Sequence, residues 1–151
     1  MMISPEIKAS IKNSVLCWLA TVSEGGQPNV SPKEVFSDFG DSMVIVANIA
    51  SPQTVRNIRL HNPRVCISFV DVLVQKGFQL KGTARIVKKA DAEFAAMHAV
   101  LEPIAGKAFP FSTITVISVE QVKPIISPKY VLYPETTEAD QIASARKTYG
   151  F

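Results

Sequence analysis

The residues best suited to chemistry lie where a predicted strand gives way to a predicted helix, in residues 48–59. The apolar run 43–47 predicts the strand. Ser51 followed by Pro52 predicts the helix start, because serine caps helices and proline suits the first helical position. The N–H groups of a first helical turn are unpaired and carry positive dipole charge, so this start can seat a phosphate, with the Thr54 hydroxyl nearby. An ordinary capped helix explains the same residues.

A second candidate pair lies on the preceding predicted strand, Asn29–Phe36. Ser31 and Lys33 share one face of that strand, because side chains alternate with a period of two. Pro32 lies between them and cannot donate to a ladder, so the strand must be at an edge, bulged or broken there. A hydroxyl and an ammonium on one face can serve an anion, and two plain solvent-facing side chains would give the same pattern.

Composition limits the classes of function. The chain has 151 residues, which suits one domain, and 47% of them are apolar. The net charge of +3 is too small and too scattered to predict a nucleic-acid partner. No apolar run approaches the ~18 residues of a membrane span, and no signal-peptide pattern is present, so a cytoplasmic protein is expected. Cys17, Cys66 and the two histidines match no metal-site spacing, so no metal is expected.

Hydrophobic periodicity predicts about six strands and three short helices. The expected strands are 17–22, 29–36, 43–47, 64–70, 74–87 and 113–119. The expected helices begin at Ser4, Ser51 and Asp91. Because most connections read as hairpins, the pattern favours a small antiparallel barrel over a parallel βαβ sheet. From residue 123 the chain is expected to be irregular until a polar helical stretch near 138–147.

Several segments, in this order, resemble the split-barrel flavin-binding family related to pyridoxamine 5′-phosphate oxidase. They are Leu19-Ala20-Thr21-Val22, the hairpin 25–32, Val46-Ala47-Asn48 with Ser51, Asn62-Pro63-Arg64-Val65, the strand 77–85 and the strand 114–121. Together they cover roughly residues 13–122. The resemblance implies a mainly β fold, a six-stranded antiparallel split barrel with short flanking helices, in residues 1–122. Residues 123–151 would form a C-terminal extension that packs on the barrel or on a dimer partner.

The resemblance also implies a homodimer that binds two FMN molecules at the subunit interface. The FMN phosphate would meet Ser31, Gln53 and Thr54, with Ser51 opening the helix and Lys33 adding charge. The ribityl chain and the ring would run along Ala47-Asn48-Ile49 and the pair Val30 and Pro32. The implied cofactor-binding residues are therefore Val30, Ser31, Pro32, Lys33, Ala47, Asn48, Ile49, Ser51, Gln53 and Thr54. Phe109 or Phe111 of the partner subunit would contact the ring.

Two departures from the family pattern bear on function. Larger oxidases carry basic residues directly after the capping serine, where this chain has Pro52-Gln53. Backbone N–H groups, Thr54 and either Arg56 or Lys33 would have to compensate for them. The oxidases also use arginine and histidine in a C-terminal segment to hold pyridoxamine phosphate. The tail 130–151 has no histidine, which argues against vitamin B6 oxidation.

The leading hypothesis is an FMN-dependent oxidoreductase that passes hydride or electrons through the flavin. The chain shows no triad, carboxylate dyad or metal cluster, which fits a protein whose cofactor carries the chemistry. No catalytic side chain is assigned. The alternatives are a non-catalytic flavin-binding or electron-transfer module, and a split barrel that binds F420 or haem.

Overall fold

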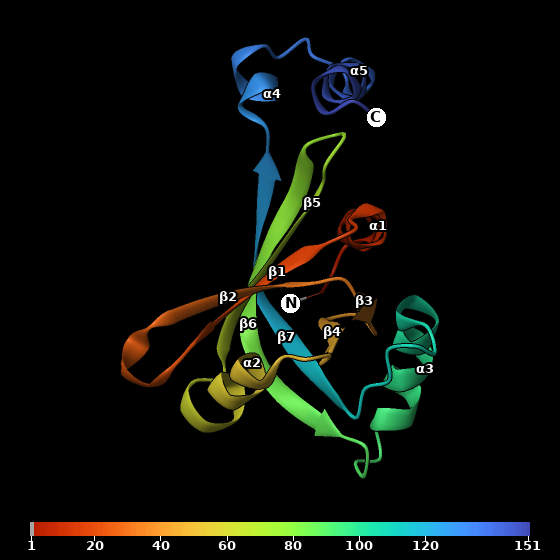
Figure 1. The fold of residues 1–151 in the computed structure, drawn as a ribbon. Coiled ribbons are helices and arrows are strands. Elements are labelled where there is room, and N and C mark those ends of the chain that lie inside the picture. The colour runs from red at the N-terminus through yellow and green to blue at the C-terminus, as the bar shows by residue number, and fades with distance from the viewer. Residues whose placement is uncertain (1) are drawn as a thin grey trace.

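The computed structural model of the protein describes residues 2–151 and contains one antiparallel sheet of seven strands (Figure 1). The strands are β1 (Cys17–Val22), β2 (Pro28–Lys33), β3 (Phe36–Phe39), β4 (Met43–Ala47), β5 (Arg64–Asp71), β6 (Lys76–Lys88) and β7 (Thr113–Ile126). The mainly β, antiparallel prediction is confirmed, but the predicted number of six strands is wrong. The expected strand Asn29–Phe36 is two strands, because β2 ends at Lys33 and β3 begins at Phe36.

The order of the strands explains why the sheet curls into a split barrel. That order is β2-β1-β5-β6-β7-β4-β3, so β2 and β3 are the two outer strands. Only Glu34 and Val35 separate them in the chain, so the sheet must curl until its two edges approach. Within residues 2–151 no ladder joins β2 to β3, and the barrel stays open at this point. Pro32 lies on an edge strand, as its missing N–H requires.

Two glycines let the backbone of the long strand β6 approach the neighbouring strands closely. A Cβ atom at Gly77 would lie 1.8 Å from the carbonyl oxygen of Phe69, and one at Gly82 would lie 1.9 Å from that of Ser118. No side chain fits at either distance, so the backbones approach closely only because these residues are glycine. The β6–β7 register shifts between Lys81 and Gly82, so the ladder is irregular at the second glycine.

The buried apolar residues form two clusters on either side of the sheet. The larger one fills the barrel around Leu19, Ile67 and Leu80, and α1 (Pro5–Asn13) closes it. The smaller cluster lies where α3 (Phe94–Ala105) packs against β4 and β7. Two apolar side chains near the ends of these helices are exposed. Val15 follows the end of α1 and is 78% exposed, and Ile104 is 49% exposed near the end of α3.

The C-terminal segment is more regular than expected. β7 continues to Ile126 because residues 123–126 pair with residues 76–79 of β6, so the irregular chain predicted from residue 123 is wrong. Two helices follow, α4 (Pro128–Leu132) and α5 (Glu138–Tyr149), and Figure 1 shows them beyond the tip of the β5–β6 hairpin. The Tyr130 hydroxyl donates to the carbonyl of Val74 at 2.6 Å. The division of the chain at residue 122 stays a prediction.

None of the helices in residues 2–151 is long and apolar enough to cross a lipid bilayer.

Candidate cofactor site

Four of the predicted residues meet at the opening of the barrel, where β2 lies against the start of a helix. This helix is α2 (Pro52–Arg56), which continues as a π-helical turn, η2 (Asn57–His61). The hydroxyls of Ser31 and Thr54 lie 3.1 Å apart, and the Lys33 ammonium donates to the Ser51 hydroxyl. We call Ser31, Lys33, Ser51 and Thr54 the hydroxyl–lysine cluster. The structure thus brings together two pairs of residues that lie 18 and 23 positions apart in the chain.

Ser51 is the N-cap residue and Pro52 begins the helix, which confirms the predicted helix start, but the Ser51 side chain makes no capping hydrogen bond. Its hydroxyl accepts from Lys33 and donates to the carbonyl of Ile49 at 3.1 Å, which turns it away from the first helical turn. The preceding residue, Ala50, has a φ of 51°, in the left-handed region that costs energy for a residue with a Cβ atom. Within the described residues no side chain caps the N–H groups at this start, which leaves them open to an anion.

Lys33 is an unusually placed cation. Its side chain is 7% exposed, and it forms no ion pair with any carboxylate of residues 2–151. Burial lowers the pKa of the Lys33 ammonium. Burial also raises the pKa of the neighbouring Cys17 thiol to about 12, so this thiol stays neutral and supplies no counter-charge. Because a buried, unpaired charge is costly, an anion bound beside Lys33 would be stabilised strongly.

The cluster retains donors for such an anion. Ser31 and Thr54 each carry one O–H, and their mutual hydrogen bond uses only one of the two protons. The Lys33 ammonium has three N–H donors, of which Ser51 takes one. Thr54 is 2% exposed, so its hydroxyl is fixed by its surroundings and does not swing freely in water. The residues present therefore fit a phosphate group.

An open cavity of about 500 Å³ adjoins this cluster, and we call it the Lys33 hollow. Pro32, Lys33, Ala47 and Ile49 line it, together with Phe109 of the same chain. These residues place apolar surface directly beside the buried ammonium, which suits a ligand with a flat ring and a charged end. Phe111, the other aromatic candidate, packs instead on His98 with 4.8 Å between ring centroids.

Three other residues that were predicted to contact the cofactor lie outside the cluster. They are Gln53, Asn48 and Val30. The Gln53 amide donates to Asn57 at 2.7 Å. The Asn48 side chain donates to Thr113 at 3.2 Å and accepts from Thr115 at 2.8 Å, so β7 holds it on both sides. Val30 lies on the outer face of β2 and is 56% exposed.

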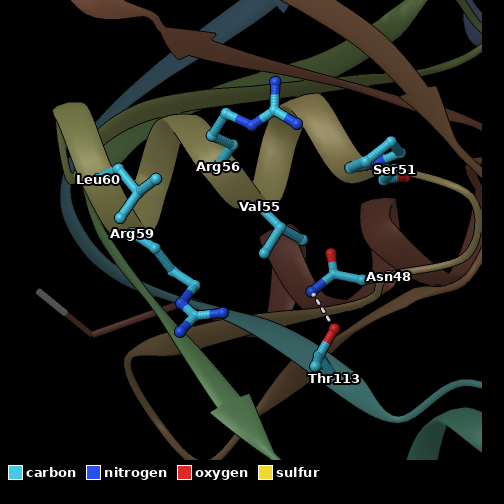
Figure 2. A pocket seen from close by; sticks show the side chains of 8 residues that line it. Asn48, Ser51, Val55, Arg56, Arg59, Leu60 and Thr113 are labelled. Atoms are coloured by element: carbon cyan, nitrogen blue, oxygen red, sulfur yellow. Dashed lines mark hydrogen bonds between the residues drawn. The ribbon is translucent and has the colours of Figure 1, made fainter.

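A second cavity, of about 540 Å³, lies along the same helix and shares Ser51 with the hydroxyl–lysine cluster (Figure 2). We call it the arginine pocket, because Arg56 and Arg59 line it together with Asn48, Ser51, Pro52, Val55, Leu60 and Thr113. Arg56 was one of two candidates to compensate for the missing basic residues at Pro52-Gln53. It lines the arginine pocket and makes no hydrogen bond to the hydroxyl–lysine cluster, whereas Lys33, the other candidate, is part of that cluster.

Sequence reasoning missed two polar contacts that hold the site in place. The buried Asn57 side chain donates to the Thr21 hydroxyl at 2.9 Å, which ties the helix to β1. Thr113 and Thr115 clamp Asn48. The period of two puts both threonines on one face of β7, which was a usable signal, but their partner follows only from the register of β4 and β7.

Comparisons with known proteins identify the family and the fold. Residues 3–126 match the family model described as pyridoxamine 5′-phosphate oxidase. HupZ of Group A Streptococcus is 31% identical with a TM-score of 0.70, and the match covers 83% of this chain and 96% of HupZ.

Two more distant structures share the fold. A putative pyridoxamine 5′-phosphate oxidase from Lactobacillus delbrueckii is 22% identical with a TM-score of 0.66, over 81% of this chain and 93% of that one. An FMN-binding protein from Syntrophomonas wolfei is 17% identical with a TM-score of 0.67, over 80% and 84%. No curated protein matches the sequence. On the match over residues 3–126, this chain belongs to the pyridoxamine 5′-phosphate oxidase family.

Proposed function

We propose that this protein binds FMN, with the phosphate at the hydroxyl–lysine cluster and the ring in the Lys33 hollow. The observation that carries the proposal is Lys33 itself, a buried ammonium without a carboxylate partner among residues 2–151, at the edge of a cavity with apolar lining residues. Ser31 and Thr54 supply hydroxyl donors at the same place. We further propose that the protein is an FMN-dependent oxidoreductase.

Each part of the site has a separate task in this proposal. Bound FMN supplies hydride or electron transfer, which no side chain of the chain provides. Lys33 balances the phosphate charge, and the uncapped helix start contributes roughly 0.3–1 kcal/mol, up to ~2 where partly buried. Pro32, Ile49 and Phe109 exclude water from one side of the ring. Micromolar binding needs about 8 kcal/mol in total, so burial of the ring must supply much of it.

A homodimer would complete the ring site. Trp18 and Pro32 are opposite each other in the β1–β2 ladder and share the outer face with Val30. Trp18 is 47% exposed and Val30 is 56% exposed, so this apolar face beside the hollow lacks cover in the single chain. A partner subunit on this face would bury it and would close the open side of the ring. Cys17 and Cys66 are both free thiols, which supports a place of action in the reducing cytoplasm.

A non-catalytic flavin carrier is the second candidate, and the lining of the hollow favours it. No histidine is among the residues that line it, so the lining offers no imidazole for proton transfer to the ring. Turnover of NADH or NADPH with an electron acceptor separates the two candidates. An inert, tightly bound flavin would favour the carrier.

The direct test of the proposal is gel filtration of the purified protein after FMN is added, followed at the visible flavin bands. We expect the flavin absorbance to co-elute with a dimer. We expect Lys33→Met to lose the co-eluting flavin, whereas Lys123→Met, at an exposed lysine on β7, keeps it. Protein without flavin absorbance in the wild-type peak would contradict the proposal, and co-elution of F420 or haem in parallel runs would replace FMN by that cofactor.

A further inference from the structure

The loop between α3 and β7, residues 106–112, forms part of the wall of the Lys33 hollow. Phe109 in this loop is 57% exposed and lines the hollow. Phe109 also lines a neighbouring cavity of about 580 Å³, which we call the α3 cavity because Phe94 and His98 of α3 line it together with Phe111. The Phe109 ring therefore lies where the two cavities meet.

Backbone hydrogen bonds fix both ends of this loop. Gly106 ends α3 with a φ of 77°, a conformation that favours glycine, and its N–H donates to the carbonyl of Glu102 at 2.8 Å. The Phe109 N–H donates to the Gly106 carbonyl at 3.2 Å, which closes a turn. At the other end the Ser112 carbonyl accepts from the Lys89 N–H at 3.1 Å. Side-chain contacts then decide how the residues between these ends are held.

An aromatic stack supplies such a contact. The His98 imidazole contacts two phenyl rings, with centroid distances of 5.3 Å to Phe94 and 4.8 Å to Phe111. Both distances lie within the ~4.5–7 Å that is typical of attractive aromatic pairs. Nδ1 of His98 lies 3.7 Å from a carboxylate oxygen of Glu102, which limits rotation of the imidazole. Phe94 is 7% exposed, so the stack begins in the core and reaches the loop through His98.

We propose that His98 is a positioning residue, which holds the loop 106–112 and with it Phe109 against the Lys33 hollow. Only Pro110 separates Phe109 from Phe111, and its fixed φ makes this link stiff. His98 lines the α3 cavity and is not among the residues that line the hollow, so it acts on a ligand there through the loop. The effect on flavin rests on the proposed function, whereas the hold on the loop needs no ligand.

Fluorescence titrations with FMN and riboflavin test the effect on the flavin ring. We expect His98→Ala to weaken both ligands by the same factor, about threefold to tenfold, because Phe109 lies against the ring and not the phosphate. His98→Phe should restore both affinities, because a phenyl ring can replace the imidazole in the stack. In a Phe109→Ala background, His98→Ala should have no further effect, because His98 acts through Phe109.

Val100→Ala is the matched control for these titrations. Val100 is exposed on the same helix and lines neither the hollow nor the α3 cavity. We expect this variant to change the affinity for either flavin by less than about twofold.

Trypsin cleavage after Lys107, an exposed residue of the loop, tests the hold on the loop without any ligand. We expect this bond to be cleaved about threefold to tenfold faster in His98→Ala than in the wild type, because a loop that opens more often is cleaved faster. His98→Phe should be cleaved at the wild-type rate. Cleavage after Lys81, in the middle of β6, should be equal in all three proteins, which separates local loosening from loss of the fold.

The two measurements distinguish failure of this inference from failure of the proposed function. If the wild type binds flavin, equal affinities in wild type and His98→Ala, or a further loss in the Phe109→Ala background, would overturn the inference. If the wild type binds no flavin, the proposed function is wrong and cleavage after Lys107 decides alone. Equal cleavage rates in wild type and His98→Ala would overturn the inference. If His98→Ala melts early, Phe111→Leu takes its place with the same expectations, because it removes the other ring of the contact and keeps an apolar side chain.

Discussion

The α2–η2 helix has two faces that treat polar groups in opposite ways. On the inner face Thr54 is 2% exposed and Asn57 is fully buried, and both are hydrogen-bonded to strands of the barrel. On the outer face Arg56 and Arg59 are exposed and form no ion pair within the described chain. Only the inner face, next to Lys33, excludes water.

Polar and charged interactions should therefore contribute more free energy on the inner face than on the outer face. Inside a protein the effective dielectric constant is low, so a hydrogen bond or a charge there has a larger effect than in water. Water and salt screen the outer arginines. We therefore expect substitutions on the inner face to change stability and cofactor binding, and those on the outer face to change both much less.

The largest expected effect is on stability, at Asn57. Asn57→Ala removes the partner of the buried Thr21 hydroxyl and should lower the free energy of unfolding by about 2–3 kcal/mol. Arg59→Ala on the outer face should stay within about 0.5 kcal/mol. Urea denaturation of both variants measures the contrast. Equal effects at the two positions would break the distinction between the faces.

The next effect concerns FMN affinity. Ser31→Ala combined with Thr54→Val removes both hydroxyls of the pair, and we expect FMN binding to weaken by roughly 1–3 kcal/mol, since hydrogen bonds to a charged group are strong. Flavin fluorescence titration gives the dissociation constants. Ser37→Ala is the control, because that hydroxyl donates to the carbonyl of the next residue on β3. An unchanged affinity in the double variant would place the phosphate elsewhere.

A smaller effect follows from the pKa of Lys33, which burial lowers below its usual 10.5. A bound phosphate favours the protonated lysine, so FMN affinity should be highest below this lowered pKa and fall as pH rises through it, by at most about tenfold per pH unit. In the free protein the unfolded chain keeps its proton up to 10.5, so the free energy of unfolding should rise across the same window. FMN titrations across this window measure the slope.

Lys33→Met should remove the part of the slope that is due to Lys33. A slope in the variant equal to that of the wild type would assign the pH dependence to another group.

Local chemistry made much of the fold predictable. Strand alternation, the bend at Gly82 and the Gly106 end of α3 were all readable from the sequence, because each rests on a few neighbouring residues. The break between β2 and β3 could be predicted from the sequence only in part. Pro32 signalled an interrupted edge, but the place of the break follows from the curl of the whole sheet.

The site was predictable in its residue types but not in its pairings. Ser31 and Lys33 share a strand face, and Ser51 and Thr54 open a helix, so both halves follow from local periodicity. Which hydroxyl meets which partner depends on how the barrel brings β2 to the helix. For the same reason, the hydrogen bond between Asn57 and Thr21, which are 36 residues apart, could not be predicted from the sequence. Burial of Lys33 is likewise a property of the closed fold.

The most direct test of the central claim compares FMN with riboflavin, which lacks only the phosphate. The wild-type protein should prefer FMN, and Lys33→Met should lower that preference by about tenfold or more while riboflavin affinity stays nearly the same. Lys123→Met should keep the wild-type preference. If Lys33→Met retains the full preference for FMN over riboflavin, the phosphate does not bind at Lys33, and the account of this site is wrong.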